Sequence, residues 1–468
     1  MHGKERNLHP KKLNLPLKNS NQKTMNMKIN NLLIVFVLAT ISLTGISQTT
    51  NTVATLTLSQ AVAMAMKQNQ DILIARNNLR IAENNSSLLN SGYLPQLTGN
   101  AGGNYSNNNT EITYSSGDKV TQDGAVSTSY NGSLGINYRL FDGMNRYYNY
   151  KILKADDTYT ELQSRALIEN TLILLSRSYY DVARLTSKIE NIKRTLGISY
   201  TRYLYIKDKY DYGQSTELDV LNSEVDLNND SVNLINTQRE LHIAHNNLDV
   251  LLGQQPGLNY QIDTLVVFNP VTNPDSLFID AMANNASYLM SLQNKEVSAL
   301  SVKQSKSGYL PTLDLNGSYA VSKTDNDVGY LLNSQNKGFS TGISLSWSIF
   351  DGGKTRTREL NSRISNENAL FLVEQSRIEL KRQFMNAYTN YRDLFYIMQV
   401  EERNMNTNKL NFDRTVEQFR LGQISSLDFR NAQVELQNAI DRYNTAKYNA
   451  KMAELELLKL AGLFLKVV

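Results

Sequence analysis

The sequence predicts a mainly α-helical chain made of two copies of one unit, in which long coiled-coil helices are interrupted by two β-hairpins. Three observations support this fold class. Several motifs occur twice, two long segments lack proline, and two segments have apolar residues at every second position. A duplicated chain of 468 residues fits one repeat structure at least as well as two or three globular domains.

The repeated motifs identify a tandem duplication. SGYLPQL begins at Ser91, and SGYLPTL begins at Ser307. Three further pairs share one offset of 209 positions, as Leu140 and Ile349 illustrate: LFDG with IFDG, YGQSTELDV with LGQISSLDF, and LLG with LAG. We expect a first repeat over residues 48–253, a linker over 254–275 and a second repeat over 276–468.

Residues 1–47 have the pattern of a leader with a secretory signal. Lys28 supplies positive charge, residues 32–44 form a short apolar core, and small residues follow at 45–47. The leader carries seven Lys/Arg residues against Glu5, so the formal charge of +4 becomes about −2 after cleavage. Bulk charge therefore gives no reason to expect nucleic-acid binding. The absence of cysteine excludes disulfides and thiolate sites.

Two segments without proline predict very long helices, over residues 143–252 and 352–461. A glycine at matching positions, Gly213 and Gly422, divides each segment and predicts a tight reversal between two antiparallel helices. Apolar and small residues at three- and four-residue spacing indicate helix packing along a seam, which an ordinary soluble bundle also shows. The two predicted stripes are Leu218, Leu221, Val225, Val232 and Ile235, and Leu436, Ile440, Tyr443, Ala446, Ala450, Ala453, Leu457 and Leu460.

The β-hairpins are expected at about residues 93–141 and 309–350. In the second, Phe339, Ile343 and Leu345 alternate with serine and glycine, which is typical of a strand with one face in lipid. Strands of about 9–11 residues suit an outer membrane, so the polar segments 106–122 and 323–337 are predicted as loops. Four strands leave open edges that lipid does not tolerate, so several chains must combine.

The motifs at the hairpin ends predict connectors between helix and strand. Pro95 and Pro311 stand where an incoming helix must stop and a strand begin. Asp142 and Asp351 stand where a carboxylate can cap the outgoing helix. We expect rigid joints there rather than mobile hinges.

These paired motifs, spread over about residues 56–462, closely resemble those of TolC-like outer-membrane efflux proteins. The resemblance implies a homotrimer in the bacterial outer membrane, with a 12-stranded barrel above a helical tunnel across the periplasm. It implies a periplasmic adaptor (membrane fusion) protein and an inner-membrane pump of the RND or ABC type as partners. It also implies a passive exit duct for drug efflux or type I secretion, with no catalysis, cofactor or metal.

The resemblance assigns roles to the two helical turns. The adaptor-contacting tip corresponds to Tyr212, Gly213, Gln214, Ser215 and Thr216, and to Leu421, Gly422, Gln423, Ile424 and Ser425. Asp219 and Asp428 would lie at the closed periplasmic mouth, unless each only caps the first turn of its helix.

This sequence departs from the family pattern at two positions of the mouth. Asn431 stands where the family has an aspartate that forms a second acidic ring, and Ile424 stands where the family has a gating arginine. Tyr210 and Phe419 are candidates for sealing the mouth by packing instead.

The alternative function is that of a secreted or surface structural coiled-coil protein with adhesive loops. The alternating hairpins favour the channel, because a coiled-coil rod needs no lipid-facing strands. No nucleophile elbow, phosphate loop or acid–base pair points to an enzyme.

Overall fold

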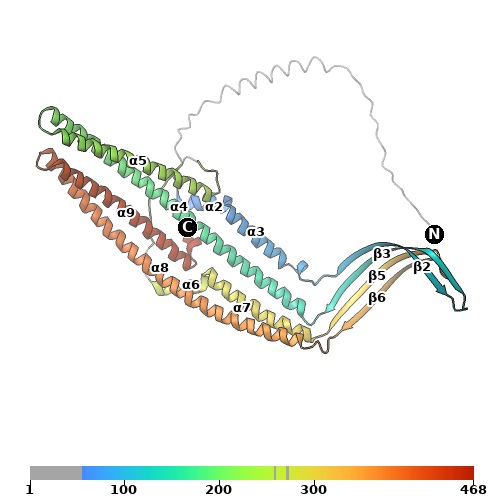
Figure 1. The fold of residues 1–468 in the computed structure, drawn as a ribbon. Helices are drawn as coiled ribbons and strands as arrows, with labels where there is room; N and C mark the ends of the chain where they lie inside the picture. Colours follow the sequence, from blue (N-terminus) through green and yellow to red (C-terminus); the bar gives the residue numbers. More distant parts are fainter. Residues whose placement is uncertain (1–54, 258–259, 270–272, 468) are drawn as a thin grey trace, which may run out of the picture. The chain divides into compact units, whose positions relative to one another are not determined.

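The computed structural model describes residues 55–257, 260–269 and 273–467, so the predicted leader and signal lie outside the described residues. Helices dominate this part of the chain, and one four-stranded sheet interrupts them (Figure 1). The main elements are α2 (Leu58–Gln68), α3 (Gln70–Asn85), β2 (Gln96–Thr113), β3 (Lys119–Phe141), α4 (Asn145–Asp211), α5 (Glu217–Leu252), α6 (Pro274–Asn284), α7 (Ala286–Ser305), β5 (Thr312–Asn326), β6 (Asn333–Ser346), α8 (Lys354–Arg420), α9 (Ser426–Leu460) and α10 (Phe464–Val467). Short 3-10 turns η1 (Leu88–Asn90) and η2 (Lys306–Tyr309) precede the two hairpins, and β1 (Thr55–Leu56) pairs in parallel with β4 (Gln261–Ile262).

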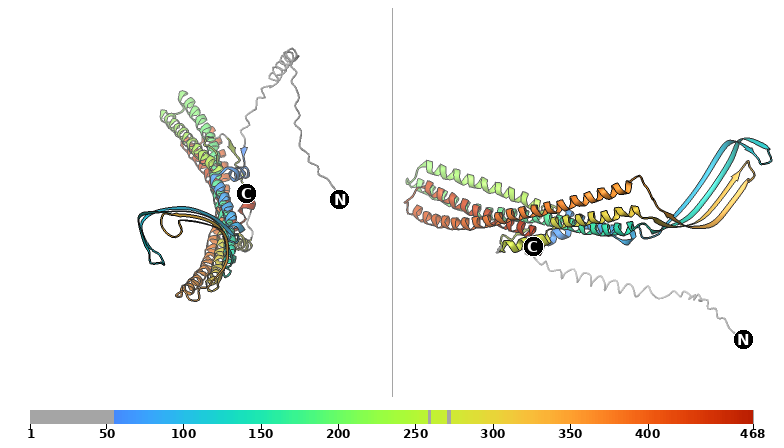
Figure 2. Two further views of the ribbon diagram at one scale, coloured as in Figure 1. Left: turned by 90° about the vertical axis from the view of Figure 1, so that its right-hand side faces the viewer. Right: turned by 90° about the horizontal axis from the view of Figure 1, so that it is seen from below.

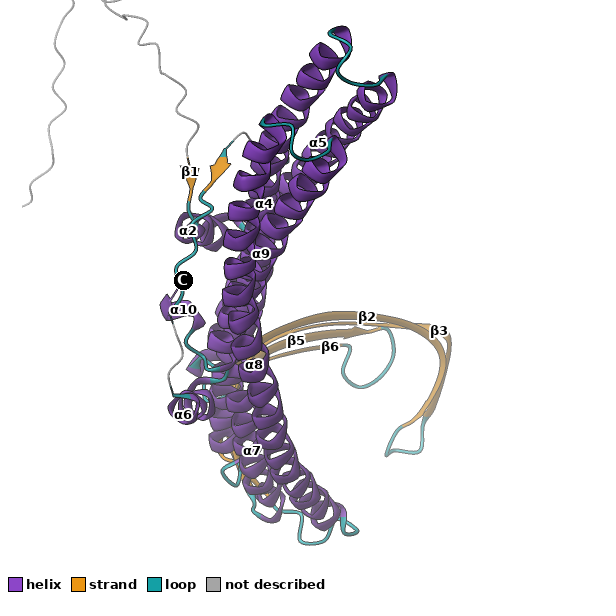
Figure 3. Ribbon diagram, turned by 90° about the vertical axis from the view of Figure 1, so that its left-hand side faces the viewer, coloured by secondary structure: helices purple, strands orange, loops and turns teal. Residues whose placement is uncertain are grey.

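Four long helices form the part of the chain farthest from the sheet. The helices α4 and α8 have 67 residues each and run back as α5 and α9. Because α4 packs against both α5 and α9, and α8 packs against α9, the order is α5-α4-α9-α8 (Figures 1 and 2). Nearer the sheet, α3 and α7 take the places of α5 and α9 (Figure 1), and α2, α6 and α10 lie along one side of the long helices (Figure 3).

The duplication is visible in the packing of these helices. Asn69 donates from Nδ2 to the Leu251 carbonyl at 2.9 Å, and Asn285 donates in the same way to Leu460 at 3.0 Å. A Cβ on Gly253 would lie 2.4 Å from the backbone of Gln68. The corresponding atom on Gly462 would lie 2.5 Å from Asn284, so each repeat needs a glycine at this contact.

The sheet is antiparallel, with the order β2-β3-β5-β6. Leu134 pairs with Tyr319, which pairs with Phe339, and paired residues share a face. That face is apolar and exposed, with Leu134 at 60% and Phe339 at 72% of full exposure. The opposite face carries serine, asparagine and glycine. In the described part of the chain, β2 and β6 each have one unpaired edge.

The strands are longer than the sequence predicted, at 18, 23, 15 and 14 residues for β2, β3, β5 and β6. The predicted loop 106–122 is wrong, because its first and last residues continue the β2 and β3 ladder. The predicted loop 323–337 is likewise mostly strand. These strand segments carry polar residues on both faces. They therefore lack the alternation of apolar and polar residues from which strands are predicted.

One packing prediction also fails within the single chain. The α9 stripe is buried or half-buried as expected, but Leu218, Leu221 and Val225 of α5 are 65%, 52% and 56% exposed. The residues that α5 does bury lie on its other face and include Ser223 and Asp230. None of the described helices combines the length and the hydropathy that a membrane-spanning helix requires.

Candidate functional site at the helical turns

The two helical turns have the same backbone geometry. Gly213 and Gly422 have φ angles of +73° and +71°, which an L side chain rarely adopts. The amide of Gln214 donates to the Lys209 carbonyl at 2.7 Å, and that of Gln423 donates to Gln418 at 2.9 Å. These bonds close the C-terminal end of α4 and of α8. The turns lie at the end of the helices opposite the sheet (Figure 1).

Each turn is followed by a capping box that uses the predicted mouth aspartate. The Asp219 carboxylate accepts from the Thr216 hydroxyl at 2.7 Å and from the Ser215 hydroxyl at 3.1 Å. The Asp428 carboxylate accepts from the Ser425 hydroxyl at 2.6 Å and its amide at 3.2 Å. These hydrogen bonds to the ionised form hold the pKa of both aspartates below the usual value.

The other predicted site residues are mostly exposed. Tyr212 and Leu421, at the two turns, are 82% and 71% exposed, and Asn431 is exposed on α9. Tyr210 and Phe419 do not meet within the chain. The Phe419 ring instead packs against Tyr205 and Phe429, with centroids 5.4 and 4.7 Å apart.

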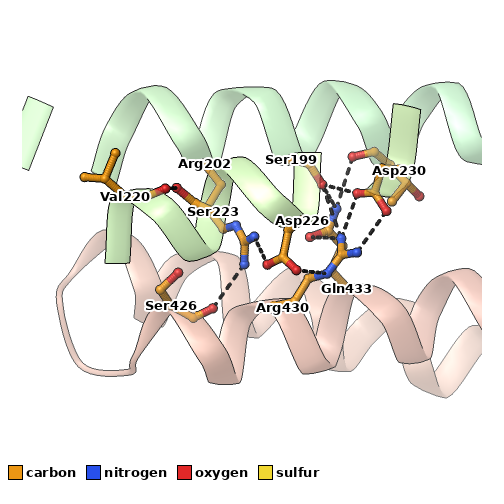
Figure 4. Close-up of polar contacts among 10 residues, drawn as sticks. Ser199, Arg202, Val220, Ser223, Asp226, Asp230, Ser426, Arg430 and Gln433 are labelled. Atoms are coloured by element: carbon orange, nitrogen blue, oxygen red, sulfur yellow. Dashed lines mark hydrogen bonds and ion pairs between the residues drawn. The ribbon is translucent and has the colours of Figure 1, made fainter. Parts of the chain in front are cut away.

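A buried polar cluster lies beside the turns and joins the two repeats (Figure 4). Arg430 of α9 donates to both carboxylate oxygens of Asp230 on α5, at 2.7 and 2.9 Å. The Ser199 hydroxyl of α4 donates to the same carboxylate at 2.6 Å. Gln433 donates to Ser199 at 2.8 Å and to the Thr195 carbonyl at 3.1 Å. Three helices therefore meet in one hydrogen-bonded network.

Arg202 extends this cluster toward the second turn. Its guanidinium pairs with Asp226 of α5 and donates from Nη1 to the carbonyl of Ser426, at the first residue of α9, at 3.3 Å. The Arg202 side chain is only 2% exposed. Arg430 also approaches Asp226, at 3.6 Å. The helix pair α4–α5 of the first repeat is thus tied to α9 of the second by paired, largely desolvated charges.

At the joints between helix and strand, the two prolines lie where they were predicted, but the two aspartates lie outside the helix cap positions. Pro95 and Pro311 directly precede β2 and β5. Asp142 and Asp351 do not occupy the cap positions, which belong to Met144 and Gly353. Their carboxylates still accept first-turn amides, from Arg146 at 3.0 Å and Thr355 at 2.8 Å.

Comparison with known proteins assigns the chain to a family. The sequence profile described as "Outer membrane efflux protein" matches residues 61–254 and 277–463. The chain belongs to the outer membrane efflux protein family. It is 23% identical over 437 residues to the outer membrane efflux protein BepC of Brucella suis, covering 91% of this chain and 90% of BepC.

Further relatives agree in sequence and fold. The outer membrane protein TolC of Escherichia coli is 21% identical over 370 residues, covering 75% of this chain and 73% of TolC. The crystal structure of VceC from Vibrio cholerae superposes with a TM-score of 0.69 at 15% identity, covering 86% of this chain and 96% of VceC.

This outer membrane efflux protein is an exit channel of the bacterial outer membrane, and its relatives are channel proteins rather than enzymes. The alternative of a secreted coiled-coil protein is therefore wrong.

Sequence reasoning missed the residues of the buried cluster. Arg430 and Asp230 lie 200 positions apart, and spacing along one helix does not reveal such a partner. The available signal was Asp226 and Asp230 at i and i+4, because paired acids on one helix face need cations from elsewhere.

Proposed function

We propose that three copies of this chain assemble into a 12-stranded barrel that continues into a helical tunnel. The observation that carries the proposal is the four-stranded sheet with an exposed apolar face and an unpaired edge on β2 and on β6. Lipid tolerates neither unpaired edge, and three such sheets joined edge to edge give a barrel of 12 strands.

The helices support the same assembly. In the order α5-α4-α9-α8, the outermost helices α5 and α8 both expose apolar residues. Val232 and Ile235 of α5 are 57% and 65% exposed, and Tyr396 and Leu410 of α8 are 62% and 57% exposed. A second copy placed with its α5 beside this α8 would cover both stripes and close a ring of helices.

The tunnel's far end is proposed to receive a periplasmic adaptor, which links the channel to an inner-membrane pump of the RND or ABC type. The two turns suit this contact because they are exposed, rigidly closed by backbone hydrogen bonds and alike in both repeats. The contacting residues would be Tyr212, Gly213, Gln214, Ser215 and Thr216, with Leu421, Gly422, Gln423, Ile424 and Ser425.

The mouth of the tunnel is proposed to narrow near the capping boxes. Three copies of Asp428 facing one axis would form an acidic ring that favours cations, while Asp219 helps to hold the mouth shut. Asn431 and Ile424 leave this mouth less charged than the family pattern, so Tyr210 and Phe419 are proposed to add apolar packing. The buried cluster would keep α5 and α9 of each copy together when the mouth opens.

The first experiment measures the mass of the mature protein extracted in detergent from outer membranes. We expect a heat-modifiable trimer with β-structure by circular dichroism. A monomer would overturn the barrel, because one sheet alone leaves both edges open to lipid.

The tip assignment is tested by placing a photo-crosslinking amino acid at Tyr212 or Leu421 and co-expressing the cognate adaptor. The control position is Tyr330, which is 91% exposed in the β5–β6 loop at the far end of the sheet. We expect crosslinks to the adaptor from the two turns and none from Tyr330. Equal or no crosslinking at all three positions would contradict the assignment.

A further inference from the structure

A cavity of about 370 Å³ lies between α4 of the first repeat and α8 and α9 of the second, close to the turns. Four aromatic rings form a continuous cluster in its wall. Tyr205 contacts Phe419 at 5.4 Å, Phe419 contacts Phe429 at 4.7 Å, and Phe429 contacts Phe412 at 5.5 Å between centroids. Such a wall offers both faces and edges of rings to a planar apolar group.

The charged residues that line this cavity are all arginines, namely Arg194, Arg202 and Arg420. Arg420 already pairs with Glu417 at 3.2 Å on the surface. The Nε of Arg202 is buried and has no acceptor among the described residues, although its two other nitrogens are used. Arg194 is exposed and makes no hydrogen bond or ion pair within the described part of the chain. Arg194 is therefore the unpaired cationic side chain of the lining that a bound molecule can reach.

A glycine keeps the cavity open. Gly197 lies in the interior of α4, where glycine costs about 1 kcal/mol relative to alanine. Its φ is not positive, and a Cβ built on it would meet nothing within 4 Å. The backbone conformation at Gly197 therefore does not require glycine. The absence of a side chain at this position leaves the cavity open.

We propose that this cavity binds a small aromatic anion, a carboxylate or sulfonate on one or two fused rings. The ring system inserts among Tyr205, Phe419 and Phe429, and the anionic group meets the Arg194 guanidinium. The volume lies at the small end of the range for ligand pockets, about 300–1,000 Å³. A bound molecule would contact both repeats, because α4 and α8 supply opposite walls. The cavity is lined by residues of a single chain.

The test uses the full mature protein in lipid nanodiscs, so that detergent does not compete for the cavity. Binding of 2-naphthoate is measured by isothermal titration calorimetry and compared with 2-naphthylmethylammonium, which has the same rings and the opposite charge. We expect the anion to bind at least tenfold more tightly. Equal binding of the two probes would overturn the proposed role of Arg194.

Two variants locate the site. Gly197→Leu fills the cavity in a helix-compatible way and should weaken 2-naphthoate binding at least tenfold, without lowering the melting temperature. Its control is Tyr200→Leu, an exposed change on the same helix outside the cavity lining, which should leave binding unchanged. Arg194→Gln should weaken the binding of 2-naphthoate but not that of 2-naphthylmethylammonium. Arg194→Lys should keep most of the 2-naphthoate binding. Undiminished binding to Gly197→Leu, or equal loss in the Tyr200→Leu control, would show that the cavity is not the site.

Discussion

Arg430 and Asp230 form a two-pronged ion pair across the boundary between the repeats, with distances of 2.7 and 2.9 Å to the two carboxylate oxygens. The side chains are 15% and 7% exposed. Removing one partner of such a pair leaves a buried charge without compensation, which costs about 3–5 kcal/mol. We therefore expect Arg430→Met to lower the thermal stability of the helices strongly, as measured by circular dichroism at 222 nm.

Two controls define this effect. Arg177→Met removes an exposed pair with Glu456 and should cost no more than about 1 kcal/mol. Combining Arg430→Met with Asp230→Leu should recover most of the lost stability, because no unpaired acid remains at that position. The pair is not important for stability if Arg430→Met melts no earlier than Arg177→Met.

The joints offer a matched comparison that the duplication itself provides. Gly143 and Gly352 have φ angles of +66° and +70°, but only Gly143 is crowded, since a Cβ there would lie 2.6 Å from the Ser307 carbonyl oxygen. Gly352→Ala should cost about 1–2 kcal/mol for the left-handed backbone. Gly143→Ala should cost about 1–3 kcal/mol more for the overpacking. Melting curves of the two variants measure the difference, and equal losses would contradict the close contact.

The sequence predicted these joints and turns because their signals are local. Proline before a strand, glycine at a reversal and an acid three residues after Ser or Thr act within one turn of chain. The cluster of Arg202, Asp230 and Arg430 depends instead on which helices become neighbours, and the duplication alone does not determine that. The exposed stripe of Leu218 and Leu221 on α5 shows the same limit, because its periodicity indicates a packing partner without saying that the partner lies outside the chain.

The two faces of β6 should differ sharply in their tolerance of charge. Ile343 pairs with Leu315 on the apolar face, whereas Ser340 pairs with Ser318 on the polar face. A lysine on the lipid face of a barrel costs about 2–4 kcal/mol near the middle of the bilayer. We expect Ile343→Lys to reduce the trimer recovered from outer membranes several-fold and Ser340→Lys to leave it near wild type. The reverse ranking would mean that the apolar face points into the barrel.

The capping aspartates predict how the turns respond to acid. The pKa of Asp219 and of Asp428 is lowered in the folded chain, chiefly by the hydroxyls of Thr216 and Ser425. Each carboxylate therefore contributes stability above its unfolded pKa, near 3.8, and that stability is lost as the pH falls through the lower folded value. Hydrogen exchange of the first-turn peptides, corrected for intrinsic rates, should stay slow to below pH 4 and then rise.

The same measurement tests the proposed acidic ring. Three Asp428 carboxylates facing one axis repel each other, which opposes the capping effect and raises their pKa. In the assembled trimer the second turn should then lose protection at a higher pH than the first turn, whose Asp219 lies outside the ring. Asp428→Asn should remove this early loss at the second turn, because the amide still accepts a hydrogen bond but does not titrate. Identical acid profiles of the two turns in the wild-type trimer would place Asp428 away from the axis and leave it a helix cap alone.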